Sequence, residues 1–102
     1  MSGDPSVVNG RSLEQLVREI VAEVLVISAD EVTPGAALIR DLGAESIDFL
    51  DLVFRLEDAL GARIPYTWWQ DFLSASLGGA DLSTAVTPEV VRAFAEEEMA
   101  RA

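Results

Sequence analysis

The stretch that decides the fold reads DLGAESIDFLDLVFRLEDAL, residues 41–60, in which a short loop leads into an amphipathic helix. Gly43 supplies the backbone freedom that a turn needs. Ser46 is a favourable N-cap, because its hydroxyl can accept hydrogen bonds from the free amides of a first helical turn. Gly61 directly follows the stretch, where helix C-termini favour glycine. The pattern therefore predicts a helix from Ser46 to Leu60.

This helix has two apolar faces, which is more than a purely structural surface helix needs. The broader face must pack on a core and contains Phe49, Leu52, Val53, Leu56 and Leu60. A second apolar line beside a charged stripe contains Ile47, Leu50 and Phe54. Either the helix is central and covered on both sides, or the second line docks a partner next to the serine at the helix tip. Geometry alone leaves both interpretations open.

The segment Asp41-Leu-Gly-Ala-Glu-Ser46-Ile-Asp48 resembles the phosphopantetheine attachment site of acyl carrier proteins, whose usual core is Asp-Leu-Gly-x-Asp-Ser-Leu. This chain has Glu and Ile at the positions of the usual Asp and Leu, and both changes are conservative. The resemblance continues through the helix and its Gly-x-x-Ile-Pro ending. It covers roughly Ser12 to Pro65, and the later residues match more loosely.

The resemblance implies that Ser46 carries a covalent 4′-phosphopantetheine arm, added from coenzyme A by a separate phosphopantetheinyl transferase. The arm would hold acyl groups as thioesters and deliver them between enzymes of fatty acid or lipid biosynthesis. The residues expected to dock acyl synthases and acyltransferases with basic patches are Glu45, Ile47, Asp48, Leu50, Asp51, Phe54 and Asp58. The candidates for an acyl-chain pocket are Phe49, Val53, Leu56, Trp69, Phe72 and Phe94.

The helix sequence, together with Ile64-Pro65 and Trp69, is similar to the specialised carriers that deliver very long acyl chains to lipid A. An extra aromatic segment before the last helix fits that type. A stand-alone carrier of a polyketide or other secondary pathway could have a similar insert. An unmodified acidic helical module, binding a partner helix through Ile47, Leu50 and Phe54, is the alternative from another class.

The composition indicates one small globular domain with a strongly acidic surface. The 102 residues carry a net charge of −11 and are 50% hydrophobic. Such a charge repels nucleic acid and anionic membranes and favours basic partners. No apolar run is long enough to span a bilayer, and the first residues do not form a secretory signal. We therefore expect a cytoplasmic monomer without membrane insertion.

Enzymatic readings are disfavoured, because the chain has no His and no Cys and so lacks the usual bases and nucleophiles. Asp41, Glu45, Asp48 and Asp51 could attract a divalent cation, but their spacing fits no calcium loop. We expect a solvated acidic patch there and no metal site. A carrier that serves as a substrate for other enzymes needs little chemistry of its own.

Helical periodicity predicts an all-α, acyl-carrier-like bundle with three main helices and an extra, short aromatic helix before the last. The first helix is expected from Ser12 to Val26, with a capping box between Ser12 and Gln15. The aromatic helix, capped by Thr67, should run to about Leu77.

The remaining segments complete the expected domain, residues 12–102, behind a flexible lead-in, residues 1–11. The long connection before Ser46 should be held down by Leu38 and Leu42. Residues 82–86 form a loop of uncertain conformation. A last helix is expected over residues 88–100, with the acidic run 96–98 on a solvated face.

Overall fold

The computed structural model describes residues 7–8 and 11–101. The helices are α1 (Leu13–Leu25), the 3-10 turn η1 (Ala29–Glu31), α2 (Ser46–Leu60), α3 (Tyr66–Leu77), α4 (Leu82–Ala85) and α5 (Pro88–Arg101). A minimal antiparallel pair, β1 (Val7–Val8) with β2 (Arg11–Ser12), precedes α1. The expected lead-in otherwise lies outside the described residues. The all-α prediction is confirmed.

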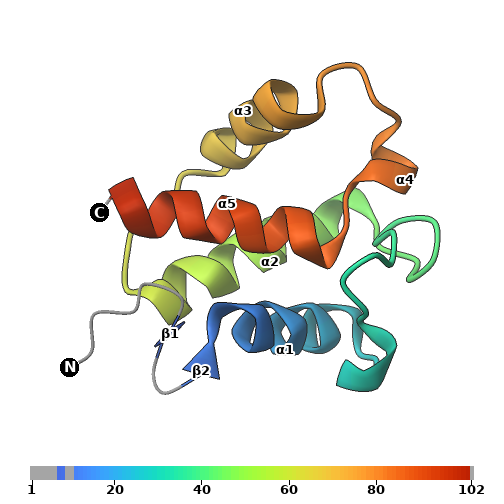
Figure 1. The fold of residues 1–102 in the computed structure, drawn as a ribbon, viewed down its shortest axis with the longest axis horizontal. Coiled ribbons are helices and arrows are strands. Elements are labelled where there is room, and N and C mark those ends of the chain that lie inside the picture. The colour runs from blue at the N-terminus through green and yellow to red at the C-terminus, as the bar shows by residue number, and fades with distance from the viewer. Residues whose placement is uncertain (1–6, 9–10, 102) are drawn as a thin grey trace.

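The bundle is built around α1, which packs against both α2 and α5. Figure 1 shows α1 and α3 running in one direction and α2 and α5 in the other. As a result, the end of α1, the start of α2, α4 and the start of α5 gather at one end of the molecule. The start of α3 and the end of α5 lie towards the other end, where the connection leaves α2 (Figure 1).

The core is formed by the inward faces of the helices together with anchors from the connections. Its buried members include Leu13, Leu16, Val17, Ile20, Val21, Leu38, Phe49, Leu52, Val53, Leu56, Ile64, Trp69, Val86, Val91 and Phe94. The broad apolar face predicted for α2 is thus confirmed, with Leu60 partly buried at its end. Leu38 is fully buried and Leu42 partly buried, as expected for the long connection.

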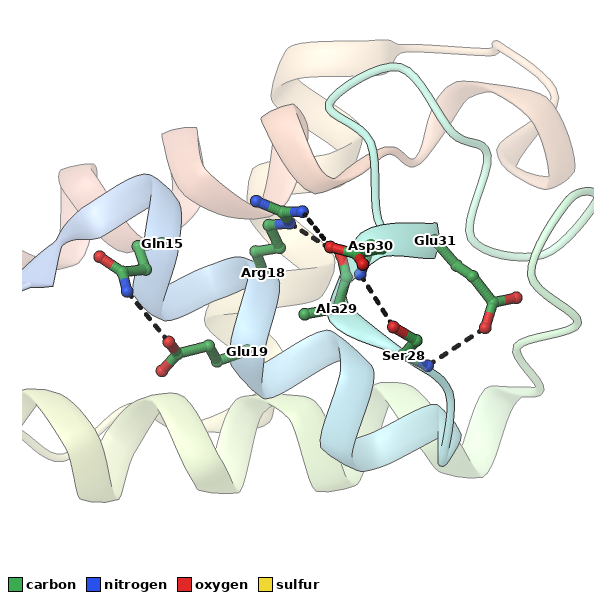
Figure 2. A network of polar contacts seen from close by, with 7 residues as sticks. All are labelled: Gln15, Arg18, Glu19, Ser28, Ala29, Asp30 and Glu31. Atoms are coloured by element: carbon green, nitrogen blue, oxygen red, sulfur yellow. Dashed lines mark hydrogen bonds and ion pairs between the residues drawn. The ribbon is translucent and has the colours of Figure 1, made fainter.

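The connection between α1 and α2 is also tied down by polar contacts, shown in Figure 2. Arg18 of α1 donates to the carbonyl of Ala29 at 2.8 Å and pairs with Asp30 at 3.3 Å. Within η1, Ser28 accepts from the amide of Asp30, and its own amide donates to Glu31. A connection of this length is therefore ordered by its own capping and by α1.

Local details at the helix starts differ from the sequence predictions. Ser12 does accept from the amide of Gln15 at 3.1 Å, but the Gln15 side chain bonds Glu19 instead of completing a capping box. α3 starts one residue before Thr67, with Pro65 in the N-cap position. The carbonyl of Pro65 accepts from the amide of Trp68, and its fixed φ of −59° suits a helix start, so Thr67 is not the cap.

Two further expectations are wrong in the C-terminal part. The segment of uncertain conformation is a short helix, α4, capped by Asp81, whose carboxylate accepts from the amide and the hydroxyl of Ser83. Glu98, expected on a solvated face, is 3% exposed. Pairing with Arg101 at 3.1 Å offsets the cost of burying this carboxylate. Arg101 in turn lies over the ring of Trp68, 4.6 Å from its centroid.

Candidate attachment site

Ser46 lies exposed at the start of α2. The sequence predicted Ser46 as the N-cap, but the structure puts Glu45 in that position and makes Ser46 the first helical residue. The capping contact comes from Asp48, whose carboxylate accepts from the amide of Glu45 at 2.8 Å. Among the residues that the structure describes, none hydrogen-bonds the Ser46 hydroxyl. Because Asp48 caps the helix, that hydroxyl remains available for chemistry.

The loop before Ser46 is braced by Asp41. One carboxylate oxygen accepts from the amide of Ala37 at 2.9 Å, and both oxygens contact the guanidinium of Arg40 at 2.9 and 3.1 Å. The hydrogen bond from Arg40, followed by that from Ala37, lowers the pKa of Asp41 from 3.8 to about 2. Asp41 is therefore ionised at neutral pH and closes the turn that carries the chain towards α2.

Gly43 completes this loop in a left-handed conformation, with φ of +77°. Its amide donates to the carbonyl of Ile39 at 3.1 Å, and the amide of Ala44 donates to Leu38 at 2.8 Å. A side chain at Gly43 would be strained by that φ, although space is open around it. The motif thus has glycine at this position because the backbone adopts a conformation that other residues rarely take.

A second support for the loop comes from α4. The amide of Leu38 donates to the carbonyl of Val86 at 2.9 Å, and the amide of Arg40 donates to Ser83 at 3.1 Å. Sequence reasoning missed this contribution, because residues 82–86 were expected to be a loop. The available signal was Asp81, a good N-cap directly before four residues that tolerate a helix.

The predicted docking residues all lie on α2 or directly before it. Ile47 is 65% exposed and Phe54 59% exposed, while Leu50 between them is half-buried. The sequence left open whether other parts of the chain cover both faces of this helix. In the described residues, nothing covers Ile47 and Phe54, so the helix is not packed on both faces. The line is a free surface that begins directly after Ser46 and extends about two turns along α2.

The acidic residues of this face are not equally available to a partner. Asp48 is engaged in capping, and Asp51 pairs with Arg55 at 3.1 Å. Arg55 also reaches Glu23 of α1 at 3.1 Å, a contact between helices that sequence analysis did not foresee. Asp58 is exposed at the far end of the stripe.

An open groove of about 300 Å³ runs beside this apolar line, between α2 and the start of α3. Its lining residues are Leu50, Val53, Phe54, Glu57, Arg63, Ile64, Pro65 and Tyr66. Glu57 shapes this region, because its carboxylate accepts from the amide of Ile64 at 2.8 Å. The groove is mainly apolar and begins one helical turn from Ser46.

The acyl-chain pocket candidates divide between this groove and the packed interior. Val53 borders the groove although it is almost fully buried, and Leu56 is fully buried in the core. Phe49 and Trp69 stack with ring centroids 6.0 Å apart. Phe94 meets Trp69 at 5.1 Å and Phe72 at 5.3 Å. The structure therefore brings the four aromatic candidates together as one cluster between α2, α3 and α5.

Two negative findings bear on other site types. In the described part of the chain, no group of three or more His, Cys, Asp or Glu side chains could hold a metal ion. No helix there is both long and apolar enough to cross a membrane.

Comparisons with known proteins agree with this site. The family described as "Phosphopantetheine attachment site" matches residues 15–68, which is more than half of the chain. The "Acyl carrier protein AcpXL" of Brucella melitensis biotype 1 is 45% identical over 53 residues, covering 52% of this chain and 57% of that protein. The protein of the same name from Brucella suis biovar 1 gives the same identity and coverage. The chain thus spans little more than half the length of these curated relatives.

The family match begins in α1, includes the braced loop, Ser46 and all of α2, and ends in the first turn of α3. Proteins of this kind are carriers and not enzymes, and their prosthetic group is covalently attached 4′-phosphopantetheine. The chain belongs to the phosphopantetheine-attachment family and is an acyl carrier protein.

Proposed function

We propose that Ser46 is the attachment point of the 4′-phosphopantetheine arm, and that the protein delivers acyl thioesters between enzymes of fatty acid or lipid biosynthesis. The observation that carries this proposal is the exposed Ser46 hydroxyl at the start of α2, without a hydrogen-bond partner among the described residues. The first turn of a helix presents free amides and a positive dipole end, which suit a phosphodiester.

The residues around Ser46 fit the group. When bound, the arm supplies a terminal thiol that holds the acyl group. Asp48 caps α2 without using the Ser46 hydroxyl, and the brace at Asp41 fixes the direction from which the chain reaches it. The groove between α2 and α3 begins at Leu50 and gives an attached chain an apolar surface close to its tether.

We propose that partners dock on α2 through Ile47, Leu50 and Phe54. These side chains are exposed or half-buried and lie on a protein of net charge −11, which supports partners with basic patches around an apolar spot. The partners are a phosphopantetheinyl transferase, acyl synthases and acyltransferases. We propose further that the protein acts as a cytoplasmic monomer, with residues 12–102 as one carrier domain.

We propose that the acyl groups carried by the protein include the very long chains of lipid A. The resemblance of α2 and the aromatic segment to carriers of that type supports this choice, as does 45% identity over 53 residues to proteins named AcpXL. That identity covers about half of the chain. Trapping the acylated protein from its native cell and weighing the chain would separate lipid A from polyketide and other pathways.

Intact mass after incubation with coenzyme A and a broad-specificity transferase tests the attachment site. The wild type should gain the mass of one phosphopantetheine, and Ser46→Ala should gain none. Ser74→Ala, at an exposed serine of α3, is the matched control and should be modified like the wild type. A mass gain in Ser46→Ala would place the arm elsewhere. No gain in the wild type would favour the unmodified interaction module.

A further inference from the structure

Helix α3 has only one fully buried side chain. Trp69 is 2% exposed, whereas the other apolar residues of α3 that face inwards are only partly buried: Tyr66, Trp68, Phe72, Leu73 and Leu77. The position of α3 against α2 therefore depends on where the Trp69 ring lies.

The Trp69 ring fills the space where α2, α3 and α5 meet. It stacks on Phe49 of α2 at 6.0 Å with an interplanar angle of 20°, and it meets Phe94 of α5 edge-on at 5.1 Å. Phe94 is fully buried, so this cluster has no open side towards the core. Nothing else that is large can occupy this space while the ring remains there.

This cluster stands close to the tether. Phe49 is three residues after Ser46, which is about 4.5 Å along a helix axis. α3 runs opposite to α2 (Figure 1), and Trp69 stacks directly on Phe49 in the first turn of α2. Two paths for a chain attached at Ser46 follow from these positions. The chain can lie in the outer groove beyond Leu50, or it can pass between α2 and α3 at the Phe49–Trp69 stack.

We propose that Trp69 is the residue that determines which acyl chains enter the protein interior. This inference rests on the function proposed above. Short chains stay in the outer groove, which the ring leaves open. Long chains expose more apolar surface than the groove covers, and the gain from burying it grows with each methylene until it offsets the cost of displacing the ring.

A pair of single-tryptophan proteins tests this inference, since the chain has two tryptophans. Trp68→Phe leaves Trp69 as the only indole, and Trp69→Phe leaves Trp68, which lies against Arg101 and serves as the matched control. Each protein is prepared in its holo form and loaded with acetyl, octanoyl and hexadecanoyl groups. Fluorescence emission and acrylamide quenching are then recorded.

We expect the Trp69 emission of the acetyl form to match that of the holo form. The hexadecanoyl form should shift to longer wavelength and be quenched several-fold more readily, because its ring has left the core. Trp68 emission should change little across the series. Trp69 emission that is the same for all chain lengths would overturn the inference.

A second measurement follows the chain instead of the ring. Cleavage of the octanoyl thioester by hydroxylamine should be several-fold slower in Trp69→Phe than in the wild type, because the smaller ring admits a chain that the indole keeps outside. Equal rates would contradict the inference. The intact mass of every sample distinguishes the two proposals: without an arm on Ser46 the proposed function fails, whereas a loaded protein with an unresponsive Trp69 rejects only this inference.

Discussion

Helices α2 and α3 lie against each other, but the fold holds them in different ways. α2 buries Phe49, Leu52, Val53 and Leu56, and its first turn is capped by Asp48. α3 buries Trp69 alone, and its N-cap, Pro65, provides no side-chain hydrogen bond. A helix with few buried apolar side chains unfolds locally at a lower free-energy cost than one with many. α2 is therefore the fixed platform for Ser46, and α3 is the element that can yield to a ligand.

The largest expected effect is the loss of stability when an apolar side chain of α2 is truncated, compared with a matching truncation in α3. Leu56→Ala should lower the free energy of unfolding by about 2–5 kcal/mol, because it leaves a cavity at a fully buried position of α2. Leu73→Ala removes the same atoms from a half-buried position of α3 and should cost clearly less. Urea unfolding followed by circular dichroism measures both. Equal costs would show that α3 is as firmly integrated as α2.

A smaller effect is expected where the end of α5 contacts the first turn of α3. Arg101→Met takes the cation from the buried carboxylate of Glu98 and from the ring of Trp68, which should cost about 1–3 kcal/mol. Hydrogen exchange should become faster in the first turns of α3 and stay unchanged in α2.

The matched control for this change is Arg92→Met. Arg92 pairs with Glu89 and Glu96, both exposed and both on α5, so its loss should cost less than about 1 kcal/mol and leave α3 unaffected. If Arg101→Met accelerated exchange in α2 as much as in α3, the two helices would open as one unit.

The smallest expected effect concerns Asp41 in the loop that precedes α2, and it depends on pH. The pKa of Asp41 is about 2 in the fold against a usual 3.8, so its ionised form stabilises the folded state above pH 3.8. That contribution is lost as the pH falls through about 2. Asp41→Asn should therefore be less stable than the wild type at neutral pH, with a difference that shrinks as the pH decreases across this range.

Urea unfolding at several pH values measures this difference. Asp58→Asn, which removes the same charge from an exposed residue of α2, is the control for net charge. A difference between Asp41→Asn and the wild type that remained constant down to pH 2 would show that the carboxylate charge does not brace the loop.

The sequence was sufficient to predict the helices that bury an apolar face. The bounds of α2 agree with the prediction, and those of α1 and α5 differ from it by no more than one residue at either end. In these segments the apolar residues recur at helical spacing and the end signals lie beside them. The second apolar line was also predicted, and Ile47 and Phe54 are exposed on a face that the core does not use, while its docking role stays a prediction.

The features that sequence analysis missed depend on contacts between distant residues. Ser46 was a reasonable N-cap, but Glu45 takes that position, and the Asp48 carboxylate accepts from the Glu45 amide. Glu98 looked like part of a solvated run, but in the fold it is buried and pairs with Arg101, which lies over the ring of Trp68. Whether the aromatic residues line a pocket or fill one depends on the relative positions of α2, α3 and α5, which periodicity does not specify.

The hydrogen bonds from the attachment loop to α4 have a consequence for how such proteins vary. Both acceptors, at Ser83 and Val86, are main-chain oxygens, so these hydrogen bonds require no particular side chain, although the buried Val86 must stay apolar to pack in the core. The number of residues between Gly78 and Val86 is therefore a stricter requirement than their identity. Deleting a single residue there would pull the backbone out of register with the loop, whereas most single replacements would leave the serine where it is.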